Sequence, residues 1–145
     1  MVNAFRVAAM VAIILIAGAA GPLKAAAEPV VVRIELGQQR MTVRGGGVRY
    51  IWPVSTARRG MVTPLGSYRP NAMVRWHRST LYRGAPMPHS IFFTGNYAIH
   101  GTTEIGRLGS RASHGCVRLH PANARRLFEL VGDAGRSNTR IEVVR

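Results

Sequence analysis

Two short segments contain the residues best suited to catalysis in this chain of 145 residues. They are Ile99-His100-Gly101-Thr102 and Ser113-His114-Gly115-Cys116-Val117-Arg118. A cysteine attacks as its thiolate, so it needs a base and N–H donors that hold the developing oxyanion. Cys116 would supply the sulfur, ionised near neutral pH, and His100 the base. The pair therefore predicts nucleophilic catalysis by a cysteine.

The glycines beside these two residues fit the same chemistry. Gly115 allows the chain to turn tightly enough for neighbouring amides to point at a substrate carbonyl. His100 ends a predicted strand, which is a rigid position from which to aim an imidazole. Gly101 leaves its backbone carbonyl accessible, so this oxygen could fix the tautomer of His100 in place of an aspartate.

Less specific interpretations exist for each of these residues. A lone cysteine is usually a small buried hydrophobic residue, and a lone histidine on a strand is usually structural; we read His77 and His89 in that way. A metal site is a second chemical alternative, with His100, His114, Cys116 and His120 as its ligands. These four lack the usual paired spacing of metal ligands, so we expect no metal and no other cofactor.

The N-terminal segment has the pattern of an export signal. Arg6 and the free amine are followed by an uncharged run from Val7 to Leu23, which glycines and a proline interrupt. This run is shorter than the roughly 20 apolar residues of a membrane span, and Ala25 and Ala27 fit the small-x-small cleavage rule. We therefore predict a signal peptide at residues 1–27 and a catalytic domain at 28–145. An uncleaved anchor is the alternative.

The charge is strongly positive, with 20 basic and 6 acidic residues and a net charge of +14. Removal of residues 1–27 takes away two basic residues and no acidic one, which lowers the net charge to +12 and removes Lys24, the only lysine. Arginine forks suit carboxylates and phosphates. For an exported protein this composition favours an anionic cell-wall polymer as the partner and argues against nucleic acid. Cys116 is the only cysteine, so no internal disulfide can form.

Hydrophobic periodicity predicts a mainly β domain of the sandwich or barrel type. Alternation predicts strands at 30–36 and 139–144, and a hairpin at 41–54 that turns at three glycines. Pro53 places the second hairpin strand at an edge or at its own end. Two further strands are predicted at 90–94 and 96–100, and residues 56–73 as a loop. The one predicted helix begins at Pro121 and ends at Gly132.

The two catalytic segments closely resemble the signature of the L,D-transpeptidases, the YkuD-type catalytic domain of peptidoglycan enzymes. Segments 39–43, 52–56, 63–66 and 85–89 are similar to that family as well, so the resemblance covers about residues 31–145. Some branches of the family have Asn where Arg118 stands and others have Arg. The resemblance implies a β-sandwich-like catalytic domain with one helix in its C-terminal half.

The resemblance also implies roles for individual residues. Cys116 would be the nucleophile and His100 the proton acceptor and donor. The backbone amides of His114, Gly115 and Cys116 would form the oxyanion hole, with Gly101 orienting the base and the His114 ring only shaping the loop. Ser113 and Arg118 would bind the stem-peptide carboxylate or act as hydrogen-bonding supports, and Arg118 could equally be a plain surface charge.

The implied reaction is acyl transfer between peptidoglycan stem peptides. Cys116 would attack the carbonyl of the L-configured centre of the third residue and release D-alanine, and an amine would then take the acyl group. The product is a 3→3 cross-link or an attached protein. Transfer to water would make the protein an L,D-carboxypeptidase, and a non-catalytic arginine-rich wall-binding domain is a further alternative. We expect a monomer in the periplasm or cell wall.

Overall fold

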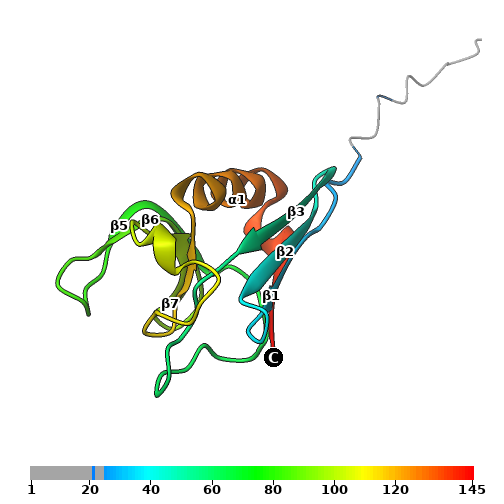
Figure 1. The fold of residues 1–145 in the computed structure, drawn as a ribbon. Coiled ribbons are helices and arrows are strands. Elements are labelled where there is room, and N and C mark those ends of the chain that lie inside the picture. Colours follow the sequence, from blue (N-terminus) through cyan, green and yellow to red (C-terminus); the bar gives the residue numbers. More distant parts are fainter. Residues whose placement is uncertain (1–20, 22–24) are drawn as a thin grey trace, which may run out of the picture.

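The computed structural model describes Gly21 and residues 25–145, so most of the predicted signal peptide lies outside the described residues (Figure 1). In this part of the chain the regular elements are β1 (Val30–Glu35), β2 (Arg40–Gly45), β3 (Val48–Pro53), β4 (Gly66–Tyr68), β5 (Ala72–Arg78), β6 (Pro86–Thr94), β7 (Tyr97–Gly101), η1 (Ile105–Arg107), β8 (Val117–Leu119), α1 (Pro121–Ala134), η2 (Arg136–Asn138) and β9 (Thr139–Val144). None of the described helices is long and apolar enough to cross a membrane.

The strands form two sheets. One has the order β3-β2-β1-β9-β4 and the other the order β5-β6-β7-β8. Most neighbours are antiparallel, but β9 pairs in parallel with β1, and β8 pairs in parallel with β7. Parallel partners need a long connection. For β7 and β8 this connection is residues 102–116, which contain the segment that ends at Cys116.

The core lies between the sheets and is closed by α1. Alternate residues of β1 and β9 point into it, as their burial patterns show, and the helix contributes Ala124, Leu127 and Val131. Because α1 contacts both β6 and β7, it stabilises the strands that precede the site (Figure 1). The molecule is thus a mainly β domain with two sheets and one α-helix in its described part, which confirms the predicted fold class.

Several predicted elements are confirmed. Strands form at 30–35 and 139–144, and β2 and β3 form the predicted hairpin with glycines at its turn. The second hairpin strand ends at Pro53 and lies at the edge of its sheet, where the missing N–H breaks no ladder.

Three predictions were wrong in detail. The helix continues past Gly132 to Ala134, and Gly135, at φ 90°, is the residue that ends it. The region 56–73 is not wholly a loop, because β4 and the start of β5 lie within it. Strand β6 begins at Pro86 rather than at 90, and β5 was not predicted, since most of its side chains are exposed and leave no alternating pattern.

Candidate active site

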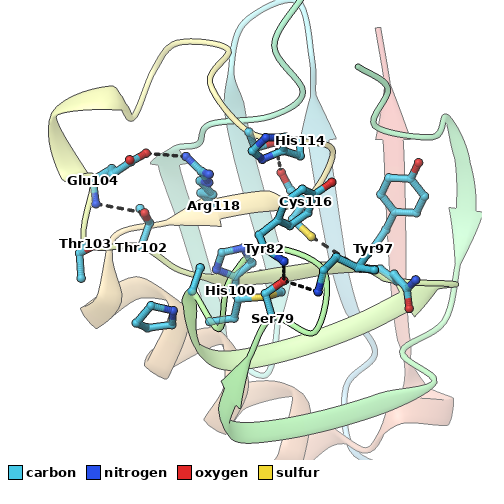
Figure 2. A pocket seen from close by; sticks show the side chains of 16 residues that line it. Ser79, Tyr82, Tyr97, His100, Thr102, Thr103, Glu104, His114, Cys116 and Arg118 are labelled. Atoms are coloured by element: carbon cyan, nitrogen blue, oxygen red, sulfur yellow. Dashed lines mark hydrogen bonds and ion pairs between the residues drawn. The ribbon is translucent and has the colours of Figure 1, made fainter. Parts of the chain in front are cut away.

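Cys116 and His100 line one pocket of about 390 Å³ (Figure 2). His100 stands near the end of β7, and Cys116 immediately precedes β8, the parallel neighbour of β7. The register pairs Ile99 with Val117 and His100 with Arg118, so Cys116 lies on the strand next to His100, displaced from it by two register positions. The sheet therefore brings together two segments that are 16 positions apart in sequence.

His100 is 6% exposed, and its Nδ1 lies 2.7 Å from the carbonyl oxygen of Gly101. A carbonyl can only accept, so Nδ1 carries the hydrogen and Nε2 keeps its lone pair. This is the contact that the sequence predicted for Gly101. Burial lowers the pKa of His100 to about 4; the Gly101 contact opposes this shift, and the charges of Arg118 and His77 add to it. The imidazole is consequently a neutral acceptor at neutral pH.

The Cys116 sulfur lies in a partly buried position with two backbone contacts. Its thiol donates to the carbonyl oxygen of Asn96 at 3.7 Å. Burial raises the pKa of this thiol, while the amide of Ala98 and the charge of Arg118 partly lower it. The expectation that the sulfur is ionised near neutral pH is wrong for the resting protein. The free energy needed to remove the thiolate from water exceeds the stabilisation that the nearby donors provide.

Ser113 holds the loop that carries Cys116. Its hydroxyl donates to the carbonyl oxygen of Cys116 at 2.6 Å and accepts from the amide of Gly115 at 3.0 Å. Ser113 is 1% exposed, so the structure favours hydrogen-bonding support over the predicted contact with substrate. The Gly115 amide, occupied by Ser113, is not free to join an oxyanion hole, which corrects that part of the prediction.

Position 115 requires a glycine, because of its backbone conformation and because of the atoms around it. Its φ is 141°, and an added Cβ would lie 2.5 Å from Tyr97 and 2.7 Å from the carbonyl oxygen of Val62. The carbonyl oxygen of Gly115 accepts from the hydroxyl of Thr63 at 2.8 Å, and that hydroxyl in turn accepts from the amide of Ala57 at 3.0 Å. The loop is thus clamped between the β3–β4 connection and β7.

The β3–β4 connection is itself anchored by buried polar contacts. Gln39 donates to the Thr56 hydroxyl at 2.6 Å and accepts from the Thr56 amide at 2.9 Å. Ser55 and Arg118 exchange backbone hydrogen bonds, and Arg58 donates its amide to the carbonyl of Ser113. These contacts explain physically why segments outside the two catalytic motifs matter to the site.

Arg118 lies at the pocket and forms an ion pair with Glu104 at 2.7 Å. Its side chain is only 18% exposed, whereas that of Glu104 is 61% exposed. The alternative that Arg118 is a plain surface charge is therefore wrong. Only one nitrogen of its fork is committed to Glu104, so other donors of the guanidinium remain for an anionic group in the pocket.

The other histidines have structural surroundings. The His114 ring stacks on Tyr82, with centroids 4.1 Å apart, and its pKa is lowered by partial burial and by Arg58 and Arg118. His120 caps α1, because its Nδ1 accepts from the amide of Ala122 at 3.2 Å. Within the described residues, no three His, Cys, Asp or Glu side chains are grouped to hold a metal, so the alternative ligand set does not form.

The sequence did not single out one part of the pocket wall. The connection between β5 and β6 contributes Ser79, Leu81 and Tyr82. The turn between β6 and β7 contributes Asn96, and Tyr97 begins β7. Leu81 and Tyr82 are large hydrophobic residues that stay 60% and 44% exposed, a signal visible only once burial is known. Figure 2 shows Tyr82 and Tyr97 close to Cys116 at the pocket.

Comparison with known proteins identifies the class to which this site belongs. Residues 29–143 match the YkuD family, described as the L,D-transpeptidase catalytic domain. The chain therefore belongs to the L,D-transpeptidase catalytic domain family, as the sequence motifs predicted. No curated protein matches the chain significantly.

Solved structures of L,D-transpeptidases share the fold. One from Xylanimonas cellulosilytica is 28% identical with a TM-score of 0.66, covering 86% of this chain and 64% of its own. One from Mycobacterium tuberculosis is 21% identical with a TM-score of 0.72 (81% and 58%). L,D-transpeptidase 3 of M. tuberculosis, solved with a faropenem-derived adduct, is 20% identical with a TM-score of 0.69 (81% and 61%). The present chain thus spans less than two thirds of each of these three relatives.

Proposed function

We propose that this protein is a cysteine-dependent peptidoglycan L,D-transpeptidase, with Cys116 as nucleophile and His100 as base. The observation that carries the proposal is the Nδ1 contact of His100 with Gly101, because it leaves Nε2 free to accept a proton in the pocket that Cys116 lines. A histidine kept only for packing would have no need of a fixed tautomer beside a thiol.

The first half-reaction follows from this arrangement. As substrate enters, Nε2 of His100 takes the thiol proton while the sulfur attacks the carbonyl carbon of the third stem residue. Collapse of the tetrahedral intermediate breaks the bond to the terminal D-alanine, and the proton passes from His100 to the leaving amine. The products are free D-alanine and a thioester on Cys116.

The second half-reaction reverses these roles. An acceptor amine attacks the thioester carbonyl, His100 takes the proton of that amine, and the thiol leaves and is reprotonated. An amide bond replaces the thioester, and no cofactor takes part. Water as the acceptor gives a free carboxylate instead, which is the carboxypeptidase outcome.

Two groups of this chain would stabilise the developing charges. The amides of His114 and Cys116 are proposed as oxyanion donors, since Ser113 occupies that of Gly115. The uncommitted donors of Arg118 would hold the stem-peptide carboxylate, because a guanidinium binds carboxylates with parallel hydrogen bonds. Glu104 keeps the Arg118 fork in place through its single contact.

The direct test compares the wild type with Cys116→Ser on a soluble stem tetrapeptide. We expect the variant to keep the wild-type melting temperature and to release no D-alanine, because a serine hydroxyl is not activated as a thiol is. A carbapenem should raise the intact mass of the wild type only; a structural relative was solved with a related faropenem-derived adduct. Normal turnover by the serine variant would refute the thiol mechanism.

We also propose that the protein is exported, acts in the periplasm or cell wall, and loses residues 1–27. The support is the uncharged run at 7–23 followed by the small residues Ala25 and Ala27. N-terminal sequencing of the protein recovered from the envelope fraction should begin at Glu28. Recovery with Met1 intact in a membrane fraction would favour the anchor instead.

A further inference from the structure

The outer face of the five-stranded sheet forms a second concavity, of about 530 Å³, that shares no residue with the catalytic pocket. It is lined by Val31, Arg33, Glu35, Arg40, Thr42, Arg44, Arg49, Ile51, Arg140 and Glu142. Strand alternation accounts for this set, since the intervening residues of β1, β2 and β9 point into the core. Five arginines and two glutamates leave the concavity with a net charge of +3.

Ion pairs satisfy only part of this charge. Arg40 donates twice to Glu35, and Glu142 pairs with both Arg33 and Arg140. Among the described residues, Arg44 and Arg49 belong to none of the ion pairs. Arg44 and Arg49 therefore carry two of the three uncompensated charges of this surface, and the third is shared by Arg33 and Arg140 on the single Glu142.

The strand register places the two arginines Arg44 and Arg49 side by side, and their repulsion destabilises the sheet. Arg44 of β2 lies directly opposite Arg49 of β3, and both are exposed. Side chains directly opposite in an antiparallel pair have Cβ atoms about 5 Å apart, where like charges destabilise the sheet. One row across the sheet reads Arg49, Arg44, Val31 and Arg140, which spans roughly 14 Å at normal strand spacing. A bound anion would relieve this repulsion.

The lining chemistry distinguishes among anions. Among the described residues, no aromatic side chain lines this concavity, so this part of the chain offers no platform on which nucleic-acid bases could stack. The two glutamates, although paired with arginines, disfavour a dense polyphosphate. A stem peptide that serves as acceptor carries both carboxylate and amine groups, and planar arginine forks bind carboxylates in the plane of both oxygens.

We propose that this arginine face is an exosite that binds the stem peptides of a peptidoglycan strand through their carboxylates and so holds the enzyme on its polymeric substrate. The proposal rests on the proposed function, since it takes peptidoglycan as the substrate. It adds a second binding site, on the opposite side of the sheet from the core, that the catalytic residues do not touch.

The test uses the full chain and purified sacculi stripped of phosphodiester-linked polymers. Arg44→Gln/Arg49→Gln should weaken sacculus binding at least tenfold at low salt. The matched control Arg125→Gln/Arg126→Gln removes the same charge from α1 and should change binding less than twofold. Turnover of a soluble stem tetrapeptide should match the wild type in both. Equal losses in the two double variants, or no loss in either, would overturn the exosite.

Two further measurements separate the remaining outcomes. Amidation of the sacculus carboxylates should abolish wild-type binding, whereas retained binding to amidated sacculi would refute carboxylate recognition. Arg49→Glu places opposite charges across the β2–β3 pair, so it should raise the melting temperature and weaken sacculus binding. A lower melting temperature would contradict the repulsion between Arg44 and Arg49. If the wild type does not turn over the soluble stem tetrapeptide, the proposed function is refuted, whatever the result of the sacculus-binding assay.

Discussion

The two side chains that are proposed to react, those of His100 and Cys116, are both uncharged at rest. Burial lowers the pKa of His100 to about 4 and raises that of the Cys116 thiol, so at neutral pH the pocket holds an imidazole and a thiol. Such a pair does not react until a substrate carbonyl and the oxyanion donors are in place to receive charge. This arrangement also protects the sulfur from oxidation, which proceeds through the thiolate.

The neutral resting state predicts slow alkylation of Cys116. The rate of modification by iodoacetamide follows the thiolate fraction, so it should be well below that of a free cysteine at pH 7 and should still be rising at pH 9. Intact mass against time at each pH provides the rates. A fast reaction that is already at its plateau at pH 6–7 would show a thiolate–imidazolium pair and contradict the neutral state.

If His100 is the base, substitutions of His100 and His114 should lower kcat/KM to different extents. His100→Gln should lower kcat/KM by roughly 10²–10⁴-fold because it removes the proton acceptor. His114→Gln should cost much less, since the His114 ring only stacks on Tyr82. If the His114 variant is inactive and the His100 variant is active, the two roles are reversed.

The pH profile of the wild type follows from the same pKa. Nε2 of His100 accepts a proton only while the ring is neutral, so kcat/KM should fall as pH decreases through about 4. An acid limb near the ordinary histidine value of about 6.5 would show that the base is not buried as described.

At the scale of elements, the loop between β7 and β8 positions Cys116, the proposed nucleophile. Ser113 and the β3–β4 connection, which includes Thr63, hold it by side-chain and backbone hydrogen bonds. Such a loop tolerates little displacement, because each bond fixes the orientation of a backbone group next to Cys116.

A pair of glycine variants tests this loop. Gly115→Ala should lower both the melting temperature and the turnover, since the new methyl group meets Tyr97 and the carbonyl of Val62. Gly132→Ala in α1 meets nothing within 4 Å and should stabilise the protein by about 0.5–1 kcal/mol with unchanged turnover. Thermal melts and D-alanine release measure both; full activity in Gly115→Ala would show that the loop can shift without loss.

At the scale of the whole molecule, the two ends of the domain are joined in one sheet. β9 inserts between β1 and β4, so the last strand completes the sheet that the first strands begin (Figure 1). The arginine face lies on the outside of this sheet, and its inner face supports the core. Folding of the catalytic domain therefore depends on pairing across almost the full length of the chain.

Two isoleucines test this dependence. Ile141 of β9 is 1% exposed and Ile51 of β3 is 53% exposed. Ile141→Ala should cost about 2–5 kcal/mol of unfolding free energy, whereas Ile51→Ala should cost less than about 0.5 kcal/mol. Denaturant unfolding of both variants gives the two values. Similar small losses would mean that β9 is not essential to the core.

Local patterns in the sequence determined the class of fold and the residues of the chemistry. Alternation predicted β1, β9 and the β2–β3 hairpin, because a half-buried strand records its burial at every second residue. The motifs around His100 and Cys116 predicted the family, and Gly101 predicted the partner of Nδ1. These features depend on neighbours in the chain, so the chain alone reveals them.

Contacts between distant segments decided the rest. Local sequence does not encode the contacts between sheets and loops. These contacts determine three features: the exposed strand β5, the hydrogen bond that occupies the Gly115 amide, and the pocket wall at Tyr82. The ionisation state of the pair also depended on tertiary structure. Burial lowers the pKa of His100 and raises that of Cys116, which opposes the formation of a thiolate and an imidazolium. The sequence thus indicated which groups are candidates for the chemistry, and the fold determined their charge and their surroundings.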